Sequence, residues 1–242
     1  MPARIIIGNW KINGTVKSLA AMMESLKSVD LAGVTVVLCP PMPLIGAASI
    51  APVAFGAQDV SAHDTGPYTG EVSAGMIAET GAKYVIVGHS DRRRNHCEKG
   101  ESIAKKAEMA FRAGLIPIIC VGESATERKS GKTLEAIEKQ LKESVPAAAQ
   151  NFIIAYEPIW AAGIGHTTPS GLDIENAHTH IYNVLRRMGK SAPVIYGGSA
   201  DAGNSGEIMS IRNVDGVMVG RASLSPADFL PIIKTGKQNV EQ

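Results

Sequence analysis

Polar residues that could carry acid–base chemistry follow several short apolar runs of this sequence. Glu157 and His89 each come directly after such a run, and Lys11 comes three residues after another. A carboxylate, an imidazole and an ammonium group can together remove a proton from carbon and stabilise the charge that develops on oxygen. Taken singly, each residue also has an ordinary structural explanation. Glu157 precedes a proline and could brace a turn, His89 could begin a helix, and Lys11 could be a solvated side chain.

Glycine-rich turns follow the last two apolar runs. Gly197-Gly198-Ser199 comes after one run and Gly220-Arg221 ends the other, and the segment 161–165 adds two further glycines. Backbone N–H groups bind phosphate well where no Cβ blocks the approach. The same glycines could simply permit tight turns. Two such turns on neighbouring runs favour a phosphate site.

The apolar runs themselves predict buried strands, because they are rich in β-branched residues and show little in/out alternation. They cover residues 4–8, 34–39, 53–57, 84–88, 116–121, 152–156, 193–196 and 217–220. Amphipathic stretches between them, at 18–29, 102–113, 133–144 and 173–188, predict helices. Strict alternation of strand and helix indicates a parallel α/β sheet.

Eight repeats leave two arrangements, a closed barrel or an open doubly wound sheet. The open sheet needs a GxGxxG fingerprint after the first strand, and Gly8-Asn9-Trp10-Lys11 does not match it. We therefore predict a (β/α)8 barrel of eight parallel strands, formed as one domain by residues 1–242. In such a barrel the C-terminal ends of the strands meet at one rim. That shared position favours the functional interpretation of each polar residue.

Composition excludes several other functions. The formal net charge of +1 gives no bulk field for nucleic acid or an anionic membrane. The run Arg92-Arg93-Arg94 is short enough to be explained by internal ion pairs. His178 and His180 lie two apart on a predicted helix and face different ways, so we expect no metal site. Three cysteines without a CxxC motif indicate a reducing compartment. No apolar run approaches membrane-spanning length, and we expect a soluble, cytoplasmic protein.

Five segments together resemble the triosephosphate isomerase family, in its order and at its spacing. They are Gly8-Asn9-Trp10-Lys11-Ile12-Asn13-Gly14, Val87-Gly88-His89-Ser90, Cys120-Val121-Gly122-Glu123, Ala155-Tyr156-Glu157-Pro158-Ile159-Trp160-Ala161 and Tyr196-Gly197-Gly198-Ser199. The resemblance covers essentially the whole chain. It implies an aldose–ketose isomerase that interconverts dihydroxyacetone phosphate and glyceraldehyde 3-phosphate, uses no cofactor and forms a homodimer.

The resemblance also implies roles for single residues. Glu157 would be the base, His89 a neutral imidazole that polarises the substrate oxygens, Lys11 the cation that offsets the enediolate, and Asn9 a donor to a substrate oxygen. N–H groups of Gly163, Ser199, Gly220 and Arg221 would bind the phosphate. Residues 158–168 would form a lid that excludes water, and residues 58–71 would form the loop that interlocks the dimer.

The sequence departs from the family pattern at three places. Asp91 stands where glutamate is usual, and we expect the shorter side chain to reach Lys11 less well. Arg221 stands where a second glycine is usual and adds a cation near the site. Ile164 and His166 replace the usual lid residues. These departures leave open an isomerase of a related phosphosugar, such as a tetrulose phosphate. A phosphate-binding barrel without catalysis is disfavoured, because all four expected catalytic residues are present.

Overall fold

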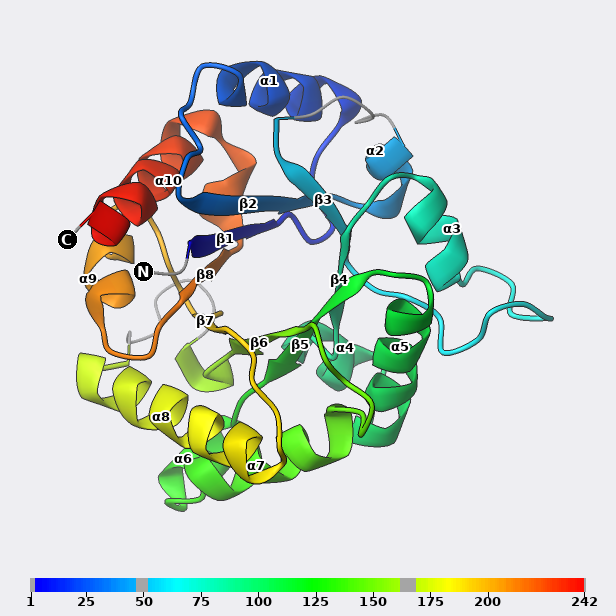
Figure 1. The fold of residues 1–242 in the computed structure, drawn as a ribbon, viewed down its shortest axis with the longest axis vertical. Helices are drawn as coiled ribbons and strands as arrows, with labels where there is room; N and C mark the ends of the chain where they lie inside the picture. The colour runs from blue at the N-terminus through cyan, green and yellow to red at the C-terminus, as the bar shows by residue number, and fades with distance from the viewer. Residues whose placement is uncertain (1–2, 47–51, 162–168, 242) are drawn as a thin grey trace.

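The computed structural model describes residues 3–46, 52–161 and 169–241, and its strands close into a barrel (Figure 1). The strands found among these residues are β1 (Arg4–Asn9), β2 (Val34–Cys39), β3 (Ala54–Ala57), β4 (Tyr84–Val87), β5 (Ile116–Val121), β6 (Ile153–Tyr156), β7 (Val194–Tyr196) and β8 (Gly216–Val219). Each pairs in parallel with the next, and β8 pairs with β1. The predicted closed barrel of eight parallel strands is confirmed, and the open sheet is excluded.

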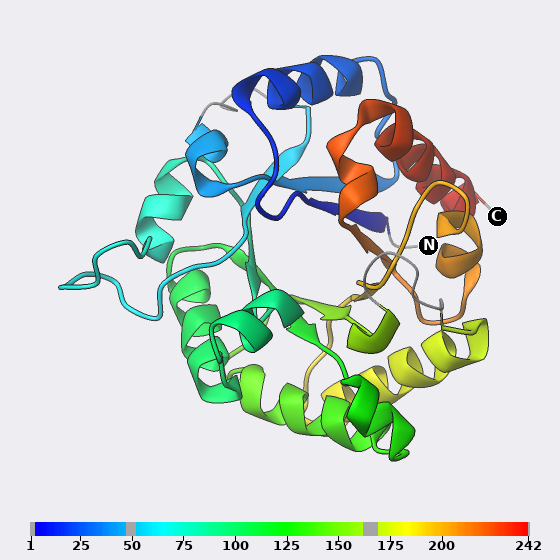
Figure 2. The same ribbon diagram turned by 180° about the vertical axis from the view of Figure 1, so that it is seen from behind.

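Helices surround the barrel in both views (Figures 1 and 2). In the described residues they are α1 (Val16–Leu26), α2 (Met42–Ile45), α3 (Ala74–Glu79), α4 (Ser90–Asn95), α5 (Gly100–Arg112), α6 (Ala125–Lys129), α7 (Thr133–Ser144), α8 (Gly171–Arg187), α9 (Ser205–Ser210) and α10 (Pro226–Glu241), with 3-10 turns η2 (Ile159–Ala161) and η3 (Arg221–Leu224). The predicted helices exist, and α7 has the predicted bounds. Helix α8 starts two residues early because Ser170 and Asp173 form a capping box before it.

Both faces of the sheet are buried, which explains the missing alternation in the sequence. On β1, Ile6 packs outward in the cluster shared with the helices, whereas Ile5 and Ile7 belong to the cluster inside the barrel. Cys39 and Cys120 also lie in the interior cluster as free thiols. Strands buried on both faces read as continuous apolar runs.

Strand β8 differs by one residue from its predicted bounds, and packing explains why it begins with a glycine. A Cβ on Gly216 would lie 1.8 Å from the carbonyl oxygen of Ile5, so no larger residue fits where β8 meets β1. Its last residue is Val219, and Gly220 therefore lies in the turn at the end of the strand. This places Gly220 and Arg221 at the C-terminal rim of the barrel.

Candidate active site

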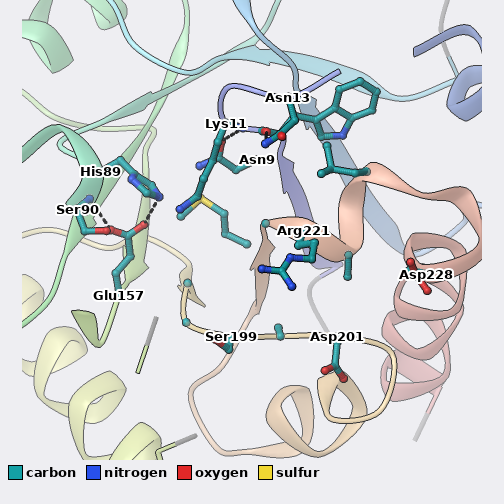
Figure 3. A pocket seen from close by; sticks show the side chains of 18 residues that line it. Asn9, Lys11, Asn13, His89, Ser90, Glu157, Ser199, Asp201, Arg221 and Asp228 are labelled. Atoms are coloured by element: carbon teal, nitrogen blue, oxygen red, sulfur yellow. Dashed lines mark hydrogen bonds and ion pairs between the residues drawn. The ribbon is translucent and has the colours of Figure 1, made fainter. Parts of the chain in front are cut away.

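A cavity of about 580 Å³ lies at the C-terminal ends of the strands (Figure 3). It is lined by Asn9, Trp10, Lys11, Asn13, His89, Ser90, Glu157, Gly197, Gly198, Ser199, Ala200, Asp201, Met218, Gly220, Arg221, Ala222, Leu224 and Asp228. The structure thus brings together the site residues predicted from sequence, with one exception. Gly163 and the lid residues 162–168 lie outside the described residues.

Glu157 directly follows β6, and its carboxylate is buried on the floor of the cavity. Its Oε2 accepts a 2.8 Å hydrogen bond from the backbone N–H of Ser90, and its Oε1 lies 2.9 Å from Nε2 of His89. Its own backbone N–H donates to Val121 O at 2.8 Å. A Cβ on Gly122 would lie 1.7 Å from Glu157 O, so the end of β5 fits tightly under this residue.

Opposing effects set the charge of Glu157. Burial acts to raise the pKa of this carboxyl, but the nearby His89 ring and the N–H of Ser90 outweigh burial and lower the pKa below its ordinary value. The side chain is therefore ionised at neutral pH. An ionised carboxylate out of water with few partners is suited to accept a proton.

His89 is the N-cap residue of α4 and also lines the cavity. It can therefore begin a helix, as the structural interpretation holds, and still act on a ligand. Its Nδ1 accepts a 3.0 Å hydrogen bond from the backbone N–H of Asp91. A nitrogen that accepts from an N–H carries no proton itself. The neutral ring consequently carries its proton on Nε2, the nitrogen close to Glu157.

Lys11 sits in a left-handed backbone conformation, with φ of +52°. Its Nζ forms a 2.8 Å ion pair with Asp91 Oδ2, so the expectation that Asp91 reaches Lys11 less well is wrong. Asp91 lies in the first turn of α4, which begins directly after the cavity residue His89. Burial acts to raise the pKa of Asp91, but the hydrogen bond from Lys11 and the nearby positive charges hold it below its ordinary value.

Hydrogen bonds to its backbone stabilise the strained conformation of Lys11. The Lys11 N–H donates to Asn9 Oδ1 at 3.1 Å, and Gln58 Nε2 donates to Lys11 O and to Cys39 O, both at 2.8 Å. Asn9 is the last residue of β1 and is almost completely buried. Because its oxygen is used by Lys11, the amide NH2 is the group that Asn9 can offer to a ligand.

The glycine-rich turns line the same cavity as Glu157 and His89. The turn after β7 is close to Glu157, since a Cβ on Gly197 would lie 3.0 Å from Cγ of Glu157. The turn after β8 is close to Lys11, since a Cβ on Gly220 would lie 4.0 Å from Cε of Lys11. A Cβ on Gly198 would lie 2.2 Å from Tyr196 Oη, so glycine is required at that turn. Ser199 donates from Oγ to Ala161 O at 3.0 Å, which ties the turn after β7 to η2. The acid–base groups and the proposed phosphate donors thus line one cavity, with the glycine-rich turns next to Glu157 and Lys11.

Comparisons with known proteins decide the family. The triosephosphate isomerase family model matches residues 4–236. The chain belongs to the triosephosphate isomerase family. Curated triosephosphate isomerases from Rhizobium etli and Chelativorans sp. are 44% and 45% identical to it, over 95% and 94% of this chain and 94% of each relative. The crystal structure of triosephosphate isomerase from Bartonella henselae superposes with a TM-score of 0.87 at 35% identity, covering 97% of this chain and 99% of that one.

Membership of the triosephosphate isomerase family confirms that the chain is an isomerase, as the five motifs predict. It also explains why this barrel keeps its polar residues at one rim. Among the residues described, no group of three or more His, Cys, Asp or Glu side chains could hold a metal ion. In the same part of the chain, no helix has the length and apolarity needed to cross a bilayer.

Several residues outside the predicted set of site residues also shape the site. Ser90 holds Glu157 through its N–H, and Gln58 braces the loop after β1. Glu123 is fully buried and accepts from Trp160 Nε1 at 2.7 Å and from Tyr156 Oη at 3.1 Å, which anchors η2, the start of the predicted lid. Gln58 directly follows β3 and Glu123 follows β5 by two residues. The rule that polar residues after strands form the site would have found both.

Other cavity residues do not lie close after a strand, so that rule would not have found them. Asn13, Asp201 and Asp228 come from loops and from the first turn of α10, several residues beyond a strand end. The Arg92-Arg93-Arg94 run proved to be largely internal. Arg92 Nε lies 2.7 Å from Glu98 Oε1, and Arg93 Nη2 donates to Cys120 O at 2.8 Å.

Proposed function

We propose that this isomerase interconverts dihydroxyacetone phosphate and glyceraldehyde 3-phosphate through an enediolate, with Glu157 as the base. The observation that carries the proposal is the cavity itself. Its lining includes a buried carboxylate, an imidazole with its proton on Nε2 and an ammonium group, together with two glycine-rich turns that can present backbone donors. A small substrate that carries both a carbonyl and an anion can use both sets of groups.

The first step is a proton transfer from carbon to the Glu157 carboxylate. The carboxylate leaves Ser90 N–H and His89 Nε2, to which it is held without substrate, and takes the proton from the carbon beside the carbonyl. The electron pair of the broken C–H bond moves into the carbonyl and forms the enediolate. The proton then returns to the neighbouring carbon, and the hydroxyl proton of the substrate moves from that carbon's oxygen to the former carbonyl oxygen, which leaves the new carbonyl. Hydrogen and electrons only change place within the substrate, so no external oxidant or reductant is needed.

The charge that develops on the substrate oxygens is stabilised by three side chains. His89 donates from Nε2 to these oxygens, Asn9 donates from its amide, and Lys11 supplies a positive charge. Lys11 is held by Asp91 on one side and by backbone hydrogen bonds on the other, so its position is set before substrate binds. A preorganised cation costs little reorganisation during the reaction.

The phosphate group of the substrate binds to N–H groups of Ser199, Gly220 and Arg221, and we assign Gly163 to the same group by its place in the family motif. Ser199, Gly220 and Arg221 line the same cavity as Glu157. Backbone N–H groups in such turns bind anions without charged side chains.

We also propose that the active form is a homodimer. The segment between β3 and α3 projects far from the barrel in both views (Figures 1 and 2). Large apolar side chains are exposed on it and nearby, with Ile12 96% exposed, Met76 58% and Tyr68 40%. Exposed apolar groups on a projecting loop favour burial against a second copy. Light scattering on the eluted protein should give twice the chain mass, and a monomer mass at assay concentration would contradict the dimer.

One domain and a cytoplasmic location complete the proposal. The first and last strands, β1 and β8, pair with each other, so the barrel cannot close without both halves of the chain. The buried free thiols of Cys39 and Cys120 agree with a reducing compartment.

The substrate assay compares two phosphosugars. Purified protein is supplied with glyceraldehyde 3-phosphate and, separately, with a tetrulose phosphate, and kcat/KM is measured for each. We expect the triose phosphate to be the better substrate. Negligible turnover of glyceraldehyde 3-phosphate together with turnover of the tetrulose phosphate would overturn the assignment. Arg221 is the feature that favours the tetrulose phosphate, because it adds a cation to the part of the cavity assigned to the phosphate group.

A further inference from the structure

Arg221 lies beside the turns whose N–H groups are assigned to the substrate phosphate. It is the first residue of η3, directly after the Gly220 turn that ends β8. Its side chain is exposed, lines the cavity, and extends into it between Lys11 and Ser199 (Figure 3). Within the described residues, the guanidinium forms neither a hydrogen bond nor an ion pair.

Among the described residues that line the cavity, Arg221 is the cation that has no carboxylate partner. Lys11, the other lysine or arginine of the described lining, is neutralised by Asp91 at 2.8 Å. Asp201 uses Oδ1 to accept the N–H groups of Gly203 and Asn204. No carboxylate in the described part of the chain lies within ion-pair distance of Arg221. An arginine in such a position has a free planar fork of donors, which matches the geometry of phosphate oxygens.

Lys11 and Arg221 approach the same space from neighbouring strands. A Cβ built on Gly220 would lie 4.0 Å from Cε of Lys11, so the turn that carries Arg221 passes directly beside the lysine side chain. Two cations on adjacent strand ends repel each other, and an anion between them relieves that repulsion. The same turn supplies the backbone donors assigned to the phosphate.

We propose that the Arg221 guanidinium binds the substrate phosphate directly and is a side-chain determinant of phosphate affinity in this chain. This inference rests on the proposed function only in taking the bound anion to be the phosphate of the substrate. The phosphate is then held by a bidentate, charge-assisted contact in addition to backbone N–H groups. Such a contact raises affinity for any tetrahedral dianion, including inorganic phosphate.

The test uses inorganic phosphate as the probe, so that it does not depend on turnover. Phosphate binding is measured by titration calorimetry on the full-length wild type, on Arg221→Gln and on Arg212→Gln, at one pH and one ionic strength. Arg212 is the matched control because it is exposed, forms no ion pair among the described residues and precedes β8 at the opposite end of the barrel. Thermal unfolding of each variant shows that it is folded.

We expect Arg221→Gln to weaken phosphate binding at least about tenfold, because hydrogen bonds to charged groups are the strong ones, and Arg212→Gln to change it less than about twofold, as exposed charges contribute little. With triose phosphate, Arg221→Gln should raise KM more than it lowers kcat. Equal phosphate affinity of folded Arg221→Gln and wild type would overturn the inference. If wild type binds phosphate but does not turn over triose phosphates, the proposed function fails and this inference is judged on the phosphate titration alone.

Discussion

Gly122 offers a test of how the barrel holds its catalytic carboxylate. It follows β5, and a Cβ at this position would lie 1.7 Å from the carbonyl oxygen of Glu157 and 2.5 Å from the carbonyl carbon. Both atoms are backbone and cannot rotate away. In Gly122→Ala the end of β5 and the segment after β6 must separate by about 1 Å or more to reach ordinary van der Waals contact.

The separation should lower both the stability of Gly122→Ala and its kcat. Overpacking of a well-packed site costs roughly 1–3 kcal/mol. For a chain of this length, each kcal/mol lowers the melting temperature by about 2–4 °C. The same shift moves Glu157 relative to Ser90 and His89, which hold its carboxylate at 2.8 and 2.9 Å. A misplacement of about 1 Å can cost roughly 10²-fold in rate, so we expect kcat to fall by about that factor.

The assay pairs thermal unfolding, followed by circular dichroism, with steady-state turnover of glyceraldehyde 3-phosphate. Gly46→Ala is the matched control, because Gly46 has an ordinary helical φ of −64° and a Cβ there meets no atom of the described residues within 4 Å. It should leave both measurements within error of wild type. A Gly122→Ala variant that melts at the wild-type temperature with kcat within about threefold of wild type would refute the reasoning, since no such fit is possible without movement.

Two further changes test the charges around the site. Asp91→Asn should lower the free energy of unfolding by less than about 1 kcal/mol, because its pair with Lys11 is partly exposed. It should nevertheless lower kcat/KM several-fold, and Asp91→Glu should retain it; full activity of the asparagine variant would show that Lys11 needs no anchor. Glu98→Gln should cost about 3 kcal/mol near neutral pH, because it breaks a buried pair with Lys106 and Arg92. Burial acts to raise the pKa of Glu98, but those two cations lower it below the ordinary value of 4.5. This stabilisation is therefore present above pH about 4.5 and is lost as the pH falls through the lower folded pKa. Urea unfolding from pH 7 to pH 3 should show the two proteins converging, and a gap that stays constant with pH would contradict the ion-pair explanation.

The strands were predictable because burial on both faces makes nearly every residue of a strand apolar. The bounds of β2 and β5 agree with the predicted ranges, and the remaining strands differ by a residue at one or both ends. Short helices such as α3, α4 and α9 were not predicted individually. Six residues are too few for an amphipathic repeat, and these helices depend on contacts with the barrel more than on propensity.

The site was predictable where a functional side chain lies within a residue or two of a strand end. Glu157 directly follows β6, and His89 comes two residues after the end of β4. What could not be predicted is how these residues hold one another. The hydrogen bond from Ser90 N–H to Glu157 joins residues 67 apart in sequence, and the ion pair of Lys11 with Asp91 joins residues 80 apart. Such distances depend on the curvature of the closed barrel. The reach of Asp91 was misjudged for this reason, because side-chain length alone does not determine how close α4 comes to Lys11.

Replacement of Glu157 by glutamine tests the central claim most directly. Gln is nearly the same size and can still approach Ser90 and His89, but it cannot accept the proton from carbon. The account predicts that Glu157→Gln lowers kcat for glyceraldehyde 3-phosphate by at least about 10². It also predicts that inorganic phosphate still binds with an affinity close to that of wild type, because the substitution removes none of the N–H groups or the Arg221 side chain assigned to the phosphate. A kcat within about tenfold of wild type would show that Glu157 is not the base.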